Sequence, residues 1–246
     1  MDELRGRRAL VTGGSRGIGA GIALALADKG ADVAISYERA ADRAAEVVRA
    51  IEAKGRRGLA IQADSADPAA IKRLVDRAVE GLGGLDILVN NAGIARMGMV
   101  ADMSLADIDA LLNVNVRAAV LASQAAIPHL KEAGRIVTIG SSVAERVQAP
   151  GVAVYSMTKS ALVAFTKGLA RELAPRDITV NLVQPGFTDT DMNPADGVHG
   201  DMLRALTPLG RYGKPEDVAA AVAFLASPAA RQITGTTVTV DGGLNT

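Results

Sequence analysis

The chain has 246 residues, of which 49% are hydrophobic, and 27 basic residues balance 27 acidic ones. This length and apolar content suit one large α/β domain, and the zero net charge argues against nucleic acid as the main partner, because phosphate binding needs a basic surface. The lack of cysteine excludes disulfides, thiolate zinc sites and cysteine nucleophiles, and only His129 and His199 offer imidazoles.

Short apolar runs rich in β-branched residues alternate along the chain with longer stretches of helical periodicity. Several of these runs are continuous, as in strands that are buried on both faces. The predicted strands are Arg8–Thr12, Asp32–Ser36, Gly58–Gln62, Ile87–Asn90, Arg135–Ile139, Thr179–Val183 and Thr237–Val240. The predicted helices are Ile18–Lys29, Ala41–Lys54, Pro68–Gly81, Leu105–Leu130, Val154–Leu173 and Pro215–Ala226.

This alternation predicts an α/β fold, a single doubly wound Rossmann-type domain over residues 1–246. Its seven-stranded parallel sheet would carry helices on both faces. We expect a cofactor half at about 1–95 and a catalytic and substrate half at about 96–246. Residues 184–211 are rich in Pro, Gly, Asp and Met with weak periodicity, which predicts a lid-like loop.

Two kinds of segment are missing from the sequence. No apolar run approaches the ~20 residues that a membrane-spanning helix needs. Residues 1–8 lack the apolar stretch of a signal peptide. We therefore expect a cytoplasmic protein with no membrane partner.

A glycine-rich loop follows the first predicted strand and opens the first predicted helix. Glycines allow close approach of the backbone to a ligand, and a helix N-terminus offers free N–H groups and a positive dipole end to a diphosphate. The spacing is Gly-x-x-x-Gly-x-Gly, not the common Gly-x-Gly-x-x-Gly fingerprint. We expect a bound dinucleotide here rather than a plain tight turn. The residues concerned are Gly13, Ser15, Arg16, Gly17, Ile18 and Gly19.

Tyr155 and Lys159 are four residues apart in a predicted helix and so share one face of it. A free tyrosine has a pKa of about 10, so lowering it to ~7 needs roughly 4 kcal/mol of stabilisation for the phenolate. A nearby cation is one way to supply that energy. Many helices place Tyr and Lys at this spacing by chance, so the pair depends on its surroundings.

Other polar residues follow the predicted strands. Asn90-Asn91-Ala92-Gly93 ends the fourth strand, Ser141 and Ser142 follow the fifth, and Pro185-Gly186 follows the sixth. Asn115 lies within the long helix before the fifth strand. Because ligands of open α/β sheets bind at the carboxyl ends of the strands, we expect these residues to line one crevice with Tyr155 and Lys159.

Together these motifs resemble the short-chain dehydrogenase/reductase family, in particular its bacterial 3-oxoacyl-carrier-protein reductase-like and carbonyl reductase members. The resemblance covers essentially the whole chain. It rests on the glycine loop, Asn-Asn-Ala-Gly, Ser142 thirteen residues before Tyr155, Tyr-x-x-x-Lys, Asn181 ahead of Pro185-Gly186, and the terminal Asp241-Gly242-Gly243.

The resemblance implies an oxidoreductase that reduces a ketone or aldehyde to an alcohol, reversibly. Tyr155 would be the general acid or base, and Lys159 would lower its pKa and bind the nicotinamide ribose. Ser142, preferred over Ser141 on family spacing alone, would hydrogen-bond the substrate oxygen. Asn115 would anchor a water chain to Lys159, and a structural helix-to-turn bond is a compatible alternative.

The resemblance also implies a nicotinamide cofactor, and we expect NADP(H) rather than NAD(H). Members that prefer NAD usually carry an acid at the end of the second strand, where this chain has Tyr37. Arg39 and Arg16 could clamp a phosphate. Glu38 is the alternative, as a ribose ligand under a one-residue shift. The further cofactor residues would be Asp64 and Ser65 at the adenine, where Asp64 could equally cap a turn, then Asn91, Ala92, Gly93, Pro185 and Gly186, with Thr188 and Thr190 at the carboxamide and phosphates.

The predicted substrate pocket has walls of Val143, Gln148, Val152, Met192 and Met202 beside Ser142 and Tyr155. The acids of residues 188–193 have metal-like spacing, but Pro194 stands where a calcium loop needs glycine, so we expect no metal. The family also implies a homotetramer or a dimer. Residues 189–195 resemble a branch with a cyclic-dinucleotide-binding biofilm regulator, which leaves a nucleotide-binding regulatory protein as the alternative function. An inactive scaffold is disfavoured by the retained catalytic residues.

Overall fold

Seven parallel strands form one sheet in the computed structural model, which describes residues 2–246. The strand order is β3-β2-β1-β4-β5-β6-β7, so the chain changes direction across the sheet between β1 and β4, the switch point at which such sheets bind ligands. The strands are β1 (Arg8–Val11), β2 (Asp32–Tyr37), β3 (Gly58–Gln62), β4 (Leu85–Asn90), β5 (Leu130–Ile139), β6 (Thr179–Pro185) and β7 (Thr237–Val240). The predicted α/β class and seven-stranded parallel sheet are confirmed.

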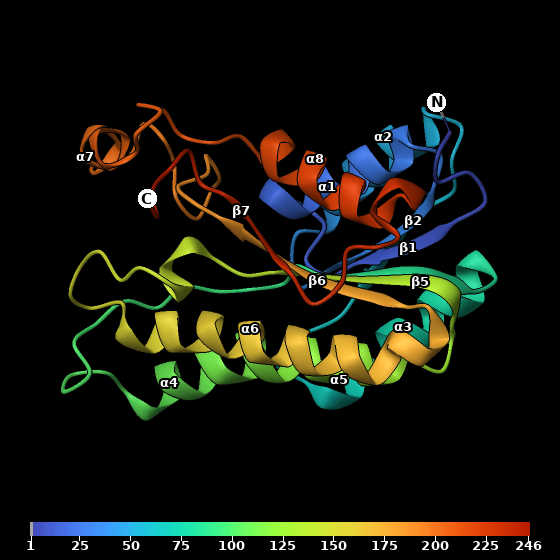
Figure 1. The fold of residues 1–246 in the computed structure, drawn as a ribbon, viewed down its shortest axis with the longest axis horizontal. Coiled ribbons are helices and arrows are strands. Elements are labelled where there is room, and N and C mark those ends of the chain that lie inside the picture. The colour runs from blue at the N-terminus through green and yellow to red at the C-terminus, as the bar shows by residue number, and fades with distance from the viewer. Residues whose placement is uncertain (1) are drawn as a thin grey trace.

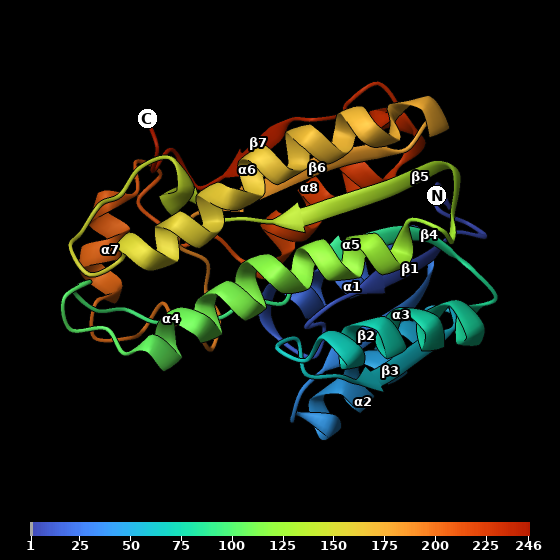
Figure 2. The ribbon, with the colours of Figure 1, turned by 90° about the horizontal axis from the view of Figure 1, so that it is seen from below.

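Helices cover both faces of this sheet (Figure 1). One face packs under α1 (Gly17–Asp28), α2 (Ala41–Glu52) and α8 (Pro215–Ala226). The other packs under α3 (Pro68–Leu82), α5 (Ala118–Ala126) and α6 (Ala153–Leu173), with α4 (Leu105–Leu112) leading into α5 (Figure 2). Two apolar layers built mainly from Ala, Val, Leu and Ile fill the space between sheet and helices.

The predicted single helix Leu105–Leu130 is wrong as a continuous α-helix. A π-helical turn, Asn113–Arg117, separates α4 from α5, and α5 ends at Ala126 so that Leu130 already belongs to β5. The wide turn contains Asn115, whose side chain bonds the backbone of Ile94 in a distant loop. π-turns of this kind occur frequently at functional sites.

The predicted lid is partly ordered into regular structure. β6 runs on to Pro185, and a short helix, α7 (Gly200–Leu206), lies within the segment. Between them Thr188 forms a β-bridge with Gly213, and Thr190 forms one with Asn193. Weak periodicity did not reveal α7, because it has only seven residues.

Side chains cap the starts of α3 and α4. The Asp67 carboxylate accepts from the N–H of Ala69, and the Ser104 hydroxyl accepts from the N–H of Asp107. No helix within residues 2–246 is both long and apolar enough to span a bilayer.

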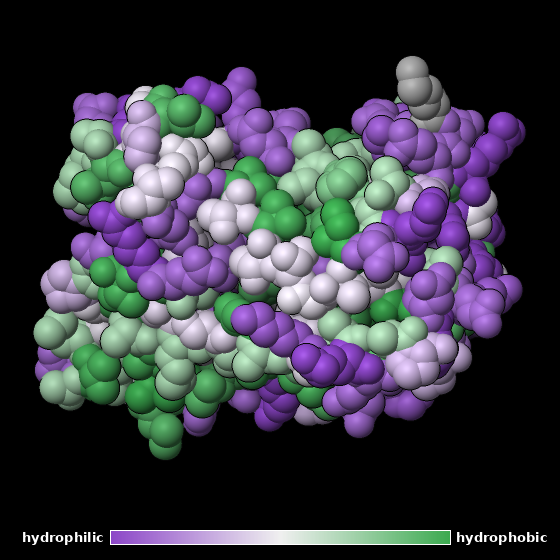
Figure 3. All heavy atoms as spheres, viewed as in Figure 1, coloured by the Kyte–Doolittle hydropathy of each residue, from purple (hydrophilic) through white to green (hydrophobic). Residues whose placement is uncertain are grey.

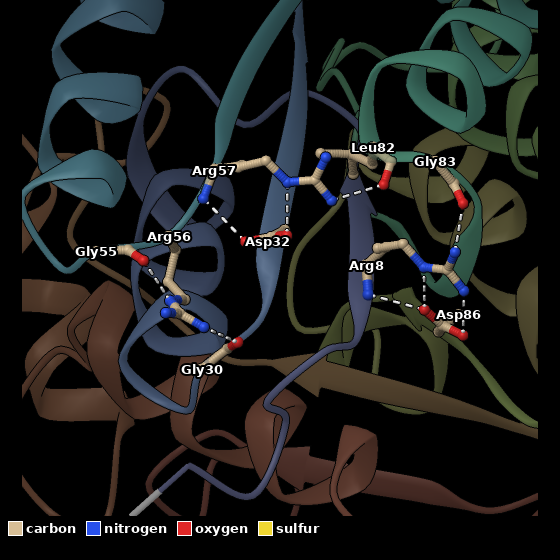
Figure 4. Close-up of polar contacts among 9 residues, drawn as sticks. All are labelled: Arg8, Gly30, Asp32, Gly55, Arg56, Arg57, Leu82, Gly83 and Asp86. Carbon is tan, nitrogen blue, oxygen red and sulfur yellow. Dashed lines mark hydrogen bonds and ion pairs between the residues drawn. The ribbon is translucent and has the colours of Figure 1, made fainter.

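Arginine–carboxylate contacts hold the amino ends of the central strands (Figure 4). The Asp86 carboxylate accepts from the backbone N and Nε of Arg8, at 2.9 and 2.7 Å. Asp32 accepts in the same way from Arg57 at the neighbouring strand pair. These contacts fix strand starts at the edge opposite the candidate site.

Candidate active site

The predicted site residues meet where the strands end. The glycine loop after β1, the Asn91–Gly93 turn after β4, and the loops after β5 and β6 all leave the sheet on the side where α7 and the first turns of α6 lie (Figures 1 and 2). Segments far apart in the chain therefore meet at the edge of the sheet where the sequence predicts a crevice.

The glycine loop is fastened to the end of β4. The Thr12 hydroxyl accepts from the N–H groups of both Asn91 and Ala92, each at 3.0 Å. The Asn91 amide donates back to the carbonyls of Thr12 and Gly13, at 2.9 and 3.1 Å. A Cβ at Gly19 would overlap the Gly13 carbonyl and the Asn91 amide, so this close approach requires glycine there.

The start of α1 is open to an anion. Arg16 is its N-cap residue, without a side-chain cap, and the first turn holds no acid. Gly17, with φ +52°, begins the helix in the left-handed region. Free N–H groups and the positive end of the helix dipole therefore remain for a ligand phosphate.

Asn115 and Lys159 come together beneath Gly93. A Cβ on Gly93 would lie 3.4 Å from both the Asn115 Oδ1 and the Lys159 Nζ atoms. Asn115 donates to the Ile94 carbonyl at 2.9 Å and accepts from the Ile94 N–H at 2.9 Å, and it donates to the Thr158 hydroxyl at 3.1 Å. The hydrogen bonds expected between the Asn115 side chain and a turn are thus present. They hold the Asn115 side chain beside Lys159.

Lys159 is buried, with 5% of its surface exposed, and its Nζ donates to the Ile139 carbonyl at 3.2 Å. Burial lowers the pKa of Lys159 to about 8. Nζ lies 6.0 Å from the centroid of the Tyr155 ring. We predicted that the Lys159 ammonium lowers the pKa of Tyr155. In the structure, burial of the phenol has the larger effect on that pKa.

Burial instead raises the pKa of Tyr155, and a hydrogen bond with the Ser141 side chain partly opposes that rise. The phenol therefore keeps its proton at neutral pH, which is the state required of a proton donor.

The serine whose side chain lowers the pKa of Tyr155 is Ser141, whereas the sequence favoured Ser142. Ser142 begins a 3₁₀ turn (Ser142–Ala144) and is 2% exposed, and its carbonyl accepts from the Asn245 amide at 3.1 Å. Below this turn, the hydroxyl of Ser156 on α6 donates to the Val143 carbonyl at 2.6 Å. The loop after β5 is thereby anchored with Ser141 toward the phenol. The role of Ser142 that the family spacing implies stays a prediction.

Tyr37 is the last residue of β2, as predicted, so Glu38 stands beyond the strand end. Arg39 is 89% exposed in its side chain and pairs with its neighbour Glu38 at 2.8 Å. The Asp64 carboxylate accepts from the Ala66 N–H at 2.7 Å, which is the turn-capping alternative for that residue. Ser65 lines a cavity of about 20 Å³ together with Thr12, Asn90 and Ala92.

The loop after β6 reaches the glycine loop. Gly186 packs against Asp241 so closely that a Cβ would lie 2.7 Å from its Cα. Thr188 is buried, and its hydroxyl donates to the Gly186 carbonyl at 3.2 Å. Thr190 packs beside Gly17, with Cγ2 3.2 Å from the position of an added Cβ. The predicted residues of this loop thus lie near the start of α1.

Two charged residues beside this loop were not predicted as site residues. Asp191 pairs with Arg16 at 3.3 Å and with Arg43 on α2. The sequence offered one indication of Arg43. It lies in the first turn of the helix after β2, and that turn follows the segment expected to meet the cofactor ribose.

The rim of the site is apolar and rich in methionine. Hydrophobic side chains gather over α7 and over α4 and its neighbouring loops (Figure 3). Met192 is 58% exposed and Met202 55%, while Val143, Gln148 and Val152 are half-buried in the loop after β5. Further exposed apolar residues on these segments are Met97, Met99, Val100, Val147, Val198, Leu206 and Leu209.

Comparisons with known proteins agree with this geometry. Residues 13–245 match the family model described as Enoyl-(Acyl carrier protein) reductase. The chain is 43% identical to the 3-oxoacyl-[acyl-carrier-protein] reductase FabG of Staphylococcus aureus, over 97% of this chain and 98% of that protein. It is 42% identical to the cyclic-di-GMP-binding biofilm dispersal mediator protein of Escherichia coli, over 98% of each chain.

A solved structure is closer still. The short chain dehydrogenase of Burkholderia cenocepacia, crystallised in complex with NADP, is 61% identical, with a TM-score of 0.98 over 99% of this chain and 100% of that one. The chain belongs to the short-chain dehydrogenase/reductase family of oxidoreductases.

Proposed function

We propose that this protein is an NADP(H)-dependent oxidoreductase that reduces a ketone or aldehyde to an alcohol, reversibly. The observation that carries this proposal is the placement of half-buried Tyr155 at the start of α6, with the Lys159 Nζ atom 6.0 Å from its ring centroid and Asn115 next to Lys159 beneath Gly93. The similar Burkholderia protein with bound NADP supports the choice of cofactor.

The residues at the start of α1 fit the dinucleotide. Glycines at 13, 17 and 19 leave room for close approach, and the uncapped helix start offers N–H groups to the diphosphate. Lys159 would bind the nicotinamide ribose, and Thr188 and Thr190 would face the carboxamide and phosphates. When bound, reduced NADP supplies the hydride.

In reduction, the Tyr155 hydroxyl gives its proton to the substrate oxygen as the carbonyl carbon becomes an alcohol carbon. Ser141 donates a hydrogen bond to the same oxygen, where negative charge develops. Lys159 and Asn115, adjacent beneath Gly93, hold the relay that returns a proton to Tyr155. The methionine-rich rim favours carbonyl compounds with apolar substituents.

Turnover of NADPH with a panel of ketones and aldehydes tests this proposal. Tyr155→Phe keeps the ring and removes the proton donor, so kcat/KM should fall by about 10²–10⁴-fold. Ser141→Ala should cost about 10²-fold or more, since it removes a donor to the developing oxyanion. Ser142→Ala is the matched control and should retain most activity. Equal losses in the two serine variants would contradict the role of Ser141.

A second candidate function is cyclic-dinucleotide binding, with catalysis secondary. Its support is the 42% identity to the Escherichia coli biofilm mediator that binds cyclic di-GMP. Calorimetric titration with cyclic di-GMP, beside the carbonyl panel, separates the two. Tight binding of that ligand with no turnover of any carbonyl would replace the first proposal with the second.

The finer expectations of a homotetramer and of a cytoplasmic location stay predictions. We propose a tetramer on the resemblance to the family.

A further inference from the structure

The segment that follows β7 folds back onto the loop after β5, far earlier in the chain. In that loop, the Arg146 guanidinium donates to the backbone oxygens of Leu244 and Thr246, each at 2.8 Å. In the opposite direction, the Asn245 amide donates to the Ser142 carbonyl at 3.1 Å. The two segments thus hold each other through donors from both sides, on the side of the sheet where α7 lies (Figures 1 and 2).

Asp241 gives this C-terminal segment a fixed shape. Its carboxylate accepts from the backbone N–H groups of Gly243 and Asn245, both at 2.9 Å. The side chain of Leu244, next to Asn245, is buried. Asn245 is therefore presented to the loop from an ordered turn, so little conformational entropy opposes its hydrogen bond with the loop.

Three consecutive carbonyls of the loop after β5 each accept a hydrogen bond from a side chain outside it. The hydroxyls of Ser156 and Ser160, both on α6, bond the carbonyls of residues 143 and 144 at 2.6 and 2.7 Å. Asn245 bonds the third, that of Ser142. The α6 bonds fix the loop against the helix that carries the phenol. The Asn245 bond restrains the backbone at Ser142 and, through it, the directions in which the hydroxyls of Ser141 and Ser142 point.

We propose that Asn245 is a positioning residue, which acts through the Ser142 peptide group to hold the serine hydroxyls of this loop toward Tyr155 and the substrate oxygen. This inference rests on the proposed carbonyl reduction, in which a serine hydroxyl stabilises the charge that develops on that oxygen. Loss of Asn245 should misplace the donor and lower kcat, while the cofactor site at the start of α1 stays intact. Arg146 acts toward the same end, because it holds the segment that carries Asn245.

Steady-state kinetics of Asn245→Ala with NADPH and a reactive carbonyl compound test this role. The variant removes the donor to the Ser142 carbonyl, so kcat should fall by roughly ten- to a hundredfold while the Kd of NADPH stays near that of the parent. Arg146→Ala should show the same split. Thr246→Val removes a hydroxyl that donates within the segment, to the Gly243 carbonyl at 2.7 Å, and serves as the control with parent kinetics.

A double-variant cycle separates positioning from a general loss of structure. Asn245→Ala should cost little further activity in whichever of Ser141→Ala and Ser142→Ala has lost the catalytic hydroxyl, because no donor is then left to misplace. Losses that multiply in both double variants would overturn the inference. A single Asn245→Ala variant with the kcat of the parent would do the same.

Hydrogen exchange supplies a readout that needs no turnover. The backbone N–H groups of residues 143–147 should exchange faster in Asn245→Ala than in the parent, because their loop loses one anchor, whereas those of β1 should be unchanged. Unchanged exchange in the loop would contradict the inference even if carbonyl reduction is confirmed. Failure of the parent to reduce any carbonyl would overturn the proposed function, and the exchange rates would still decide whether Asn245 anchors the loop.

Discussion

Burial acts on both members of the Tyr155–Lys159 pair and favours the neutral form of each side chain. It raises the pKa of the phenol, and it lowers the pKa of the ammonium to about 8. A phenol that keeps its proton is ready to donate it in reduction. Alcohol oxidation requires the phenolate, which is the minor form at neutral pH.

The two directions of the reaction should therefore respond differently to pH. Below the raised pKa of Tyr155, the phenolate fraction grows tenfold with each pH unit, so kcat/KM for alcohol oxidation should rise steadily from pH 6 to 9. Reduction should show no loss from this residue over that range. Profiles measured in both directions check this, and a flat oxidation profile would contradict it. In Lys159→Met the oxidation limb should move to higher pH, because the cation that favours the phenolate is gone.

The site residues differ in how well the sequence predicts them. Asn115, Tyr155 and Lys159 could be located because helical spacing and strand ends constrain them. Ser141 could not be separated from Ser142, because the path of an irregular loop decides which hydroxyl faces the phenol. Arg43 was missed although its helix start follows the segment expected to meet the cofactor, because the spacing of residues along the chain does not show how far a side chain reaches.

An ion pair between Arg8 and Asp86 joins the amino ends of β1 and β4. The Asp86 side chain is 5% exposed and that of Arg8 is 16% exposed. Burial alone would raise the pKa of Asp86, but hydrogen bonds from Arg8 outweigh it and the pKa is lowered. Because the folded pKa is depressed, the contribution to stability is present above the unfolded pKa and is lost as pH falls through the folded one.

Asp86→Asn should lower the free energy of unfolding by roughly 3 kcal/mol at neutral pH, because it leaves the partly buried Arg8 guanidinium without its anion. Chemical denaturation measures this, and the difference from the parent should shrink toward low pH. Asp32→Asn is the control. Its partner Arg57 is 58% exposed, so the cost should stay near 1 kcal/mol. Equal costs for the two variants would contradict the role of burial.

Elements of the catalytic half were harder to predict than the sheet. Strands such as β1 and β4 are buried and are marked by apolar runs, and each of the seven predicted strands overlaps a strand of the sheet. The π-turn at Asn115 keeps helical periodicity on both sides, and nothing in the hydrophobic pattern marks it. Helix α7 is held by contacts of its own loop, such as Arg204 to the Ala195 carbonyl at 2.8 Å. Tertiary contacts rather than local pattern decide both elements.

Helix α6 carries a stripe of small and apolar residues that stays exposed in the single chain. Met157, Ala161, Ala164 and Gly168 recur at intervals of four, three and four residues, and all are exposed. A Cβ at Gly168 would meet no atom within 4 Å, so packing within the chain does not require glycine there. Glycine within a helix costs about 0.5–1 kcal/mol relative to alanine, so a close-packed partner helix would explain it.

We therefore expect the α6 stripe to form an interface of the proposed homotetramer. Light scattering after gel filtration should give about four times the 25.2 kDa of one chain. Ala164→Arg places a long charged side chain in the middle of the stripe, where a facing helix cannot accommodate it, and should reduce the mass to that of a smaller species. Ala69→Arg makes the same change at an exposed position at the start of α3 and should leave the mass unchanged. A parent protein that runs as a monomer at micromolar concentration would contradict the tetramer. A parent tetramer that survives Ala164→Arg would place its interfaces on other faces, because helices packed through this stripe leave no room for arginine.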